Sequence, residues 1–356
     1  MMIASVASAL PENVYPQAVL SEYLKGVWSD RPEILRRMDT LHENVQVEQR
    51  HIALPLERYA GLRTFSDFNA AWIEQALLLG ERALDEALRR AGLAPRDVDA
   101  IYFSTVTGLA SPSIDARLVN RMGLRADVKR NPLFGLGCVA GAAAVSRAAD
   151  YVRAFPSHVA VVLTIELCSL TLQREDPSIA NVISSGLFGD GACAAVVVGA
   201  ERGRALDPRA EPGPRVRATR SVFYPDTEDV MGWSIGTHGF RIVLSAQVPE
   251  VARERVRPDL DRFLGEHGLT RSDVRSWVCH PGGPKVLQAL EQGLELAPDA
   301  LALSWDSLRR AGNLSSASVL LILEQTLERA RPSAGSPGVM LAMGPGFCSE
   351  FLLLGW

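Results

Sequence analysis

The chain has 356 residues, 47% of them hydrophobic and 22% charged, so it can bury a large core without disulfides or metals. Its formal net charge of −4 argues against a protein that mainly binds nucleic acid. The five cysteines include no CxxC pair, which predicts a reducing, cytoplasmic location and neither a disulfide framework nor a metal site. Neither a secretion signal nor a membrane span is expected, because no apolar run approaches roughly 20 residues.

The first part of the chain alternates between helical and strand patterns. A helix is predicted over Asn69–Ala91, where apolar residues recur every three to four positions, and Gly92 should be its C-cap. A second helix, Val139–Ala154, is rich in alanine and nearly free of charge, which predicts a central, buried position. Runs that are apolar on both faces predict buried strands. These are Asp99–Val106, His158–Ile165 and Ala192–Gly199.

The charged, proline-containing segment Glu201–Arg217 predicts an exposed connection between two parts, residues 1–205 and 215–356. The second part repeats the alternation of strands and helices. Helices are predicted at Pro258–Gly268, Pro284–Glu295 and Ser315–Arg329, and strands at Val274–Cys279, Val339–Met343 and Phe351–Leu354. Such alternation indicates a layered α/β fold.

Cys138 is the strongest candidate nucleophile of the chain. It follows a glycine turn in FGLGCVAG and precedes the predicted buried helix. A thiol at a helix N-terminus lies at the positive end of the helix dipole, which favours the thiolate. The alternative is a small buried hydrophobic residue, which describes most free cysteines.

Three further motifs carry candidate site residues. His280 ends an apolar strand before a Pro-Gly-Gly loop, where catalytic groups are common, although a histidine buried for packing is the alternative. Asn313 lies in GNLSSAS, where it either caps the next helix or, if a serine does so, keeps its amide free. Phe188, in LFGDGA, either faces a cavity or packs in the core.

Together and in this order, these motifs resemble the thiolase superfamily of condensing enzymes, and within it the chalcone-synthase-like type III polyketide synthases. The most specific pieces are the Gly137-Cys138 turn, LFGDGA, HPGGPKVL, GNLSSAS and the terminal glycine turn Gly344-Pro345-Gly346. The resemblance covers essentially the whole chain. It implies a five-layer αβαβα sandwich of two similar halves, a homodimer, and coenzyme A thioesters as substrates without any bound cofactor.

The resemblance also implies roles for individual residues. Cys138 would be the nucleophile, with His280, as an imidazolium, and Asn313 as its partners. Phe188 would be the gatekeeper between a coenzyme A tunnel and an internal cavity, and Arg50 matches a basic position at the tunnel mouth. An acyl-CoA starter held on Cys138 would be extended with malonyl-CoA, or methylmalonyl-CoA, by decarboxylative condensation and then cyclised.

Departures from the plant enzymes bear on the starter. Ile242 stands where those enzymes have a second phenylalanine, Trp233 where they have a small glycine, and Cys168 where they have a threonine near the starter pocket. The segments ELCSLT, PDTEDVMGW and GPGFCSEFLLLGW look like bacterial members that make alkylpyrones or alkylresorcinols. We therefore expect a fatty acyl starter.

Four alternatives remain open at this stage. Within the family, the starter could be aromatic or malonyl itself, as in chalcone-type or tetrahydroxynaphthalene-type enzymes. An initiating ketoacyl-carrier-protein synthase shares the Cys-His-Asn set but normally has HQAN where this chain has His280-Pro-Gly-Gly. A thiolase would need a second catalytic cysteine, for which Cys348 is the candidate. A non-catalytic acyl-binding subunit is the last alternative.

Overall fold

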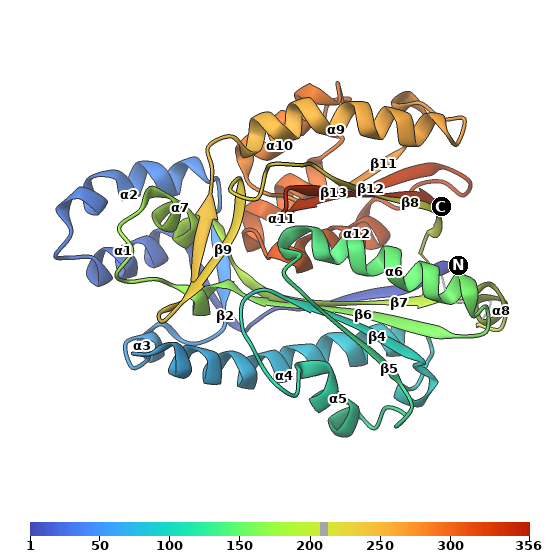
Figure 1. The fold of residues 1–356 in the computed structure, drawn as a ribbon, viewed down its shortest axis with the longest axis horizontal. Coiled ribbons are helices and arrows are strands. Elements are labelled where there is room, and N and C mark those ends of the chain that lie inside the picture. The colour runs from blue at the N-terminus through green and yellow to red at the C-terminus, as the bar shows by residue number, and fades with distance from the viewer. Residues whose placement is uncertain (207–212) are drawn as a thin grey trace.

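Two layers of strands alternate with three layers of helices in the computed structural model, which describes residues 1–206 and 213–356 (Figure 1). The outer helices on one side are α4 (Phe65–Arg90) and α5 (Ile114–Met122), and those on the other are α9 (Val248–Gly265) and α10 (Pro284–Gly293). The central layer consists of α6 (Ala140–Ala154) and α12 (Ser318–Arg329).

Each part of the chain supplies one strand layer. Residues 2–198 form β1 (Met2–Ala9), β4 (Ala100–Thr105), β5 (Lys129–Phe134), β6 (Val159–Leu167) and β7 (Asp190–Val198). Residues 215–355 form β8 (Arg215–Phe223), β11 (Ser276–Cys279), β12 (Pro337–Gly344) and β13 (Cys348–Gly355). Among the described residues the strand order is β11-β12-β13-β8-β1-β7-β6-β4-β5, and the two layers join through the single pair Met2–Arg215. The division into 1–205 and 215–356 stays a prediction.

Shorter elements gather at one end of the layers, where they surround the candidate site (Figure 1). They are β2 (Asn13–Pro16), α1 (Gln17–Val27), α2 (Pro32–Asn44), β3 (Gln49–Ile52), α3 (Leu56–Tyr59), α7 (Ile179–Leu187), β9 (Met231–Gly236) and β10 (Gly239–Leu244). Helices α8 (Ala200–Arg204) and α11 (Ala302–Ala311) complete the α-helices, and 3₁₀ turns cover Pro95–Asp97, Gly137–Val139, Cys168–Thr171, Arg271–Asp273 and Ser315–Ala317.

The alanine-rich helix α6 is buried at the centre, as its composition predicts. Its alanines pack in one cluster with side chains from both strand layers, among them Val162 and Met340. Gly141 explains the close approach, because a Cβ there would lie 2.2 Å from the Ser316 carbonyl oxygen. No larger residue fits between α6 and the turn that precedes α12.

Several element boundaries differ from the sequence predictions. Helix α4 starts at Phe65 rather than Asn69, because the Thr64 hydroxyl accepts a hydrogen bond from the Asp67 amide and the Asp67 carboxylate accepts one from the Thr64 amide. Helix α9 begins ten residues before the predicted Pro258, which lies inside it. The predicted connection 201–217 is partly outside the described residues, and its last residues, from Arg215, already belong to β8.

The described residues contain no helix that is both long and apolar enough to cross a membrane. They also contain no cluster of three or more histidine, cysteine or carboxylate side chains that could hold a metal ion.

Candidate active site

Cys138 lies in a 3₁₀ turn that leads directly into α6 and is 8% exposed. The terminal glycine turn packs against this turn from the other half of the chain. A Cβ on Gly344 would lie 2.7 Å from the Leu136 carbonyl oxygen, and one on Gly137 would lie 2.7 Å from Pro345. Of the predicted residues, Gly344 and Pro345 thus pack against the turn that carries Cys138, whereas Gly346 lies against Phe223. None of the three lines the cavity described below.

Asn313 connects the cysteine to the loop that follows the histidine strand. Its side-chain oxygen accepts a hydrogen bond from the Ser315 amide at 2.7 Å, and its Nδ2 donates to the Gly282 carbonyl at 3.3 Å. Neither Asn313 nor a serine caps α12, whose N-cap residue is Ala317, and the Ser318 hydroxyl accepts instead from the Leu314 amide at 2.7 Å. The polar side chain of Asn313 also lowers the pKa of the Cys138 thiol. The asparagine amide is thus held by its neighbours near Cys138.

His280 follows β11 and is held by its backbone amide, which donates to the Leu341 carbonyl of β12 at 2.8 Å. The side chain is 3% exposed, and both ring nitrogens lack a hydrogen-bond partner among the described residues. A buried polar group without a partner is uncommon, so both ring nitrogens have free hydrogen-bonding capacity. The imidazole is therefore free to bind a substrate atom.

Burial by itself favours the neutral forms of both groups. Desolvation raises the pKa of the Cys138 thiol to about 12, against the opposing effects of its hydrogen bond to the Ser315 hydroxyl, at 3.7 Å, and of the Asn313 side chain. Desolvation likewise lowers the pKa of His280 to about 3. The predicted thiolate therefore depends on a charged partner that offsets this effect of burial. The pairing of Cys138 thiolate with His280 imidazolium stays a prediction.

Glu166 is a site residue that the sequence analysis missed. It is fully buried on β6, where Ser316 donates to one carboxylate oxygen at 2.6 Å and Thr107 donates to the other at 3.0 Å. Burial raises its pKa to about 7, and its negative charge raises the pKa of Cys138. A single acidic residue inside the apolar run of 159–167 was the signal for this position.

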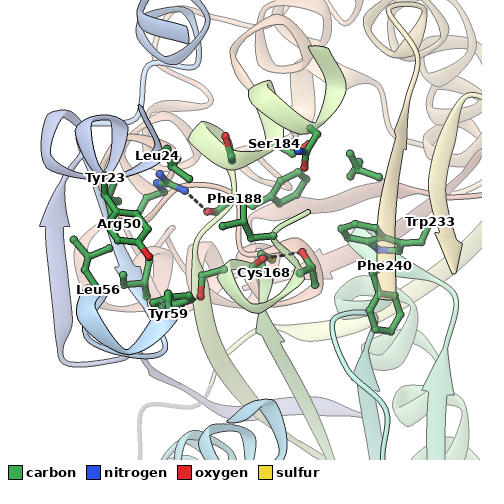
Figure 2. A pocket seen from close by; sticks show the side chains of 18 residues that line it. Tyr23, Leu24, Arg50, Leu56, Tyr59, Cys168, Ser184, Phe188, Trp233 and Phe240 are labelled. Atoms are coloured by element: carbon green, nitrogen blue, oxygen red, sulfur yellow. Dashed lines mark hydrogen bonds between the residues drawn. The ribbon is translucent and has the colours of Figure 1, made fainter. Parts of the chain in front are cut away.

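A cavity next to this cluster brings together five of the residues predicted to bind substrate. It encloses about 670 Å³, including its mouth, between α1, β3, α3, α7 and the β9–β10 hairpin (Figure 2). The five are Phe188, Cys168, Trp233, Ile242 and Arg50. Trp233 and Ile242 face each other across the hairpin as a strand pair.

Phe188 joins the cavity to the catalytic cluster. Its side chain lines the cavity, and its backbone forms a bridge with Asn313, in which the Asn313 amide donates to the Leu187 carbonyl at 2.9 Å. Cys168 also lies near the cluster, since its pKa is affected by the charge of Cys138. The gatekeeper role stays a prediction, and this placement supports it.

Arg50 lies on the cavity wall and is only 4% exposed. Its Nη1 donates to the Phe188 carbonyl at 2.8 Å (Figure 2). Its Nε donates to the Gln17 side-chain oxygen at 3.1 Å. Burial lowers its pKa to about 10, while the nearby charge of Asp190 opposes this change. In this structure the guanidinium therefore holds the segment that carries Phe188, and its predicted contact with coenzyme A is untested.

Comparison with known proteins agrees with this geometry. The model of the N-terminal domain of chalcone and stilbene synthases matches residues 1–202, and that of their C-terminal domain matches residues 215–355. A 1,3,6,8-tetrahydroxynaphthalene synthase of Streptomyces peucetius subsp. caesius is 51% identical over 99% of this chain and 93% of that protein. The α-pyrone synthesis polyketide synthase-like Pks18 of Mycobacterium tuberculosis is 31% identical over 99% of this chain and 90% of that protein.

The fold prediction is confirmed by a solved structure. The crystal structure of 1,3,6,8-tetrahydroxynaphthalene synthase from Streptomyces coelicolor A3(2) superposes with a TM-score of 0.93 at 32% identity, covering 100% of this chain and 99% of that one. The expected likeness to alkylpyrone enzymes is weaker than the likeness to the tetrahydroxynaphthalene enzyme. The chain therefore belongs to the chalcone and stilbene synthase family and is a type III polyketide synthase, an acyltransferase that condenses coenzyme A thioesters with loss of carbon dioxide.

Proposed function

We propose that this enzyme uses malonyl-CoA both as starter and as extender and forms a tetrahydroxynaphthalene-type product. The proposed starter is thus malonyl-CoA, which was the alternative to the fatty acyl starter expected from the sequence. The observation that carries it is the 51% identity, over nearly the whole chain, to a 1,3,6,8-tetrahydroxynaphthalene synthase. The naphthalene skeleton has ten carbons, which five malonyl units supply at two carbons each.

In the proposed loading step, the Cys138 thiol gives its proton to His280 and attacks the thioester carbonyl of the starter. The carbon–sulfur bond to coenzyme A breaks, and the leaving thiolate takes the proton back from His280. The acyl group is then held on Cys138 as a thioester. The unpartnered ring nitrogens of His280 support this proton transfer.

In the proposed extension step, malonyl-CoA loses carbon dioxide, and the electron pair of the broken bond forms an enolate at the thioester oxygen. Asn313 and His280 are the donors for this developing charge, because both are fixed and buried in a site of low dielectric. The enolate carbon attacks the acyl thioester on Cys138, whose thiolate leaves. The product is a β-ketoacyl-CoA that is two carbons longer and can be loaded again.

The test compares starters. Purified enzyme is incubated with malonyl-CoA alone, and the products are analysed by liquid chromatography and mass spectrometry. We expect a ten-carbon aromatic product from malonyl-CoA alone, and no product from the Cys138→Ala variant. If the wild type makes nothing from malonyl-CoA until an acyl-CoA starter is added, malonyl priming is wrong.

A fatty acyl starter is the second candidate, and the cavity wall supports it. Apolar side chains from α1 and α3 extend the cavity beyond Cys168, namely Leu20, Leu24 and Leu56. Palmitoyl-CoA added to malonyl-CoA would then give alkylpyrones at the expense of the aromatic product. A competition assay with equal amounts of both thioesters decides between the candidates.

We also propose that the enzyme works as a homodimer, as the family resemblance implies. Large apolar side chains are exposed on one protomer, including Leu109 at 40%, Phe134 at 50% and Ile235 at 50%. Contiguous exposed apolar surface marks protein interfaces, whereas single exposed apolar side chains are ordinary, so the proposal rests on the family resemblance. Light scattering coupled to size-exclusion chromatography should give twice the mass of the 38.6 kDa chain.

A further inference from the structure

Ser184 differs from the other polar side chains of the cavity. Most of these bond within the protein: Ser185 donates to the Val182 carbonyl at 2.7 Å and Thr171 to the Cys168 carbonyl at 2.8 Å. The same holds for Arg50, Tyr59, Ser169 and Asn181. The Ser184 hydroxyl is buried and has no hydrogen-bond partner anywhere in residues 1–206 and 213–356.

This lack of a partner is unusual for a serine inside a helix. Such serines commonly bond back to a carbonyl of the preceding turn, as Ser185 does in the same helix. A hydroxyl removed from water without a partner destabilises the fold. This cost is explained if a ligand completes the hydrogen bond.

The position of Ser184 suits a growing acyl chain. It lies one helical turn before Phe188, whose backbone amide donates to the Ser184 carbonyl at 3.1 Å, and both side chains line the cavity (Figure 2). Phe188 in turn is bridged to Asn313 of the catalytic cluster. Ser184 and Phe188 therefore lie on the same wall of the cavity, at the end where Phe188 is bridged to Asn313.

We infer that the Ser184 hydroxyl donates a hydrogen bond to a carbonyl oxygen of the poly-β-keto chain and so determines how far the chain extends before it cyclises. The ligand class follows from the chemistry, since each condensation adds a carbonyl oxygen, which can accept this bond. The inference rests on the proposed decarboxylative extension, but it holds for a malonyl and for a fatty acyl starter. No proton transfer or covalent step is assigned to Ser184.

The test uses Ser184→Ala and Ser184→Thr, with Ser307→Ala as the matched control. Ser307 is another buried serine hydroxyl without a partner in the described chain, and it lies on α11, outside the cavity. With whichever starter the wild type accepts, we expect the Ala variant to divert the product toward shorter lactones, so that the ratio of full-length to short product falls about tenfold. Thr should restore the ratio, and the Ser307 variant should match the wild type.

Two further measurements separate this role from a structural one. The rate of carbon dioxide release from malonyl-CoA should be unchanged in Ser307→Ala, because Ser307 lies on α11, outside the cavity. The thermal midpoint should not fall in either alanine variant, because each loses a hydroxyl that was unsatisfied. An unchanged product ratio in Ser184→Ala would overturn the inference, whereas failure of malonyl priming in the wild type would overturn only the proposed starter.

Discussion

Replacing His280 by glutamine should change the pH dependence of Cys138 reactivity. Burial raises the thiol pKa from its ordinary 9.0 to about 12, and three pKa units correspond to about 4 kcal/mol against the thiolate. In the wild type, an imidazolium at His280 would have to offset this cost. Glutamine cannot carry the charge, so burial alone would set the thiol pKa in the variant.

The assay measures the rate at which iodoacetamide alkylates Cys138 between pH 5 and pH 10, followed by mass spectrometry of the peptide. A thiol with a pKa of about 12 is ionised in about one molecule in 10⁵ at pH 7. Because the thiolate is the species that reacts, the alkylation rate of His280→Gln should rise about tenfold per pH unit and reach no plateau. The wild-type rate should reach its plateau at a lower pH and exceed that of the variant at least 100-fold at pH 7.

His42→Gln provides the matched control, because His42 is also buried, with a pKa lowered to about 4. Its ring bonds Ser21 at 2.7 Å and the Val182 carbonyl at 3.1 Å rather than remaining unpartnered. It should keep the wild-type pH profile. Equal profiles for wild type and His280→Gln would show that His280 does not control the thiol, and the reasoning from burial and pairing would be refuted.

Three further predictions concern stability and are tested by urea denaturation. Gly141→Ala should lower the free energy of unfolding by about 1–3 kcal/mol or more, because its Cβ would lie 2.2 Å from the Ser316 carbonyl oxygen. An unchanged urea midpoint would contradict the tight packing of α6. Arg50→Met should lower the free energy of unfolding by about 2 kcal/mol, because the Phe188 carbonyl loses its donor. The stability of Arg50→Lys should lie between those of the wild type and Arg50→Met. Glu166 keeps its proton in the folded state up to about pH 7 but loses it near 4.5 when unfolded, so wild-type stability should fall by about 3 kcal/mol as pH rises across that interval. Glu166→Gln should abolish this fall, and a parallel pH dependence in both proteins would argue against the raised pKa.

The regular elements with strong periodicity followed from the sequence. The central helix was located from its alanines, and the buried strands β4, β6 and β7 from runs that are apolar on both faces. The hairpin β9–β10 was not predicted, because its strands mix apolar and exposed residues without a clean alternation. The early start of α9 was also not predicted. Proline is usual at the start of a helix, whereas α9 continues through Pro258.

The sequence by itself determined the family, because the motifs around Cys138, His280 and Asn313 are specific and stand in a fixed order. Only the tertiary structure decided what surrounds them. Contacts between residues far apart in the chain bury Glu166 beside the nucleophile, turn Arg50 inward and leave the Ser184 hydroxyl without a partner. Burial and hydrogen-bond satisfaction are properties of packed layers rather than of local sequence, and for this reason no motif reveals them.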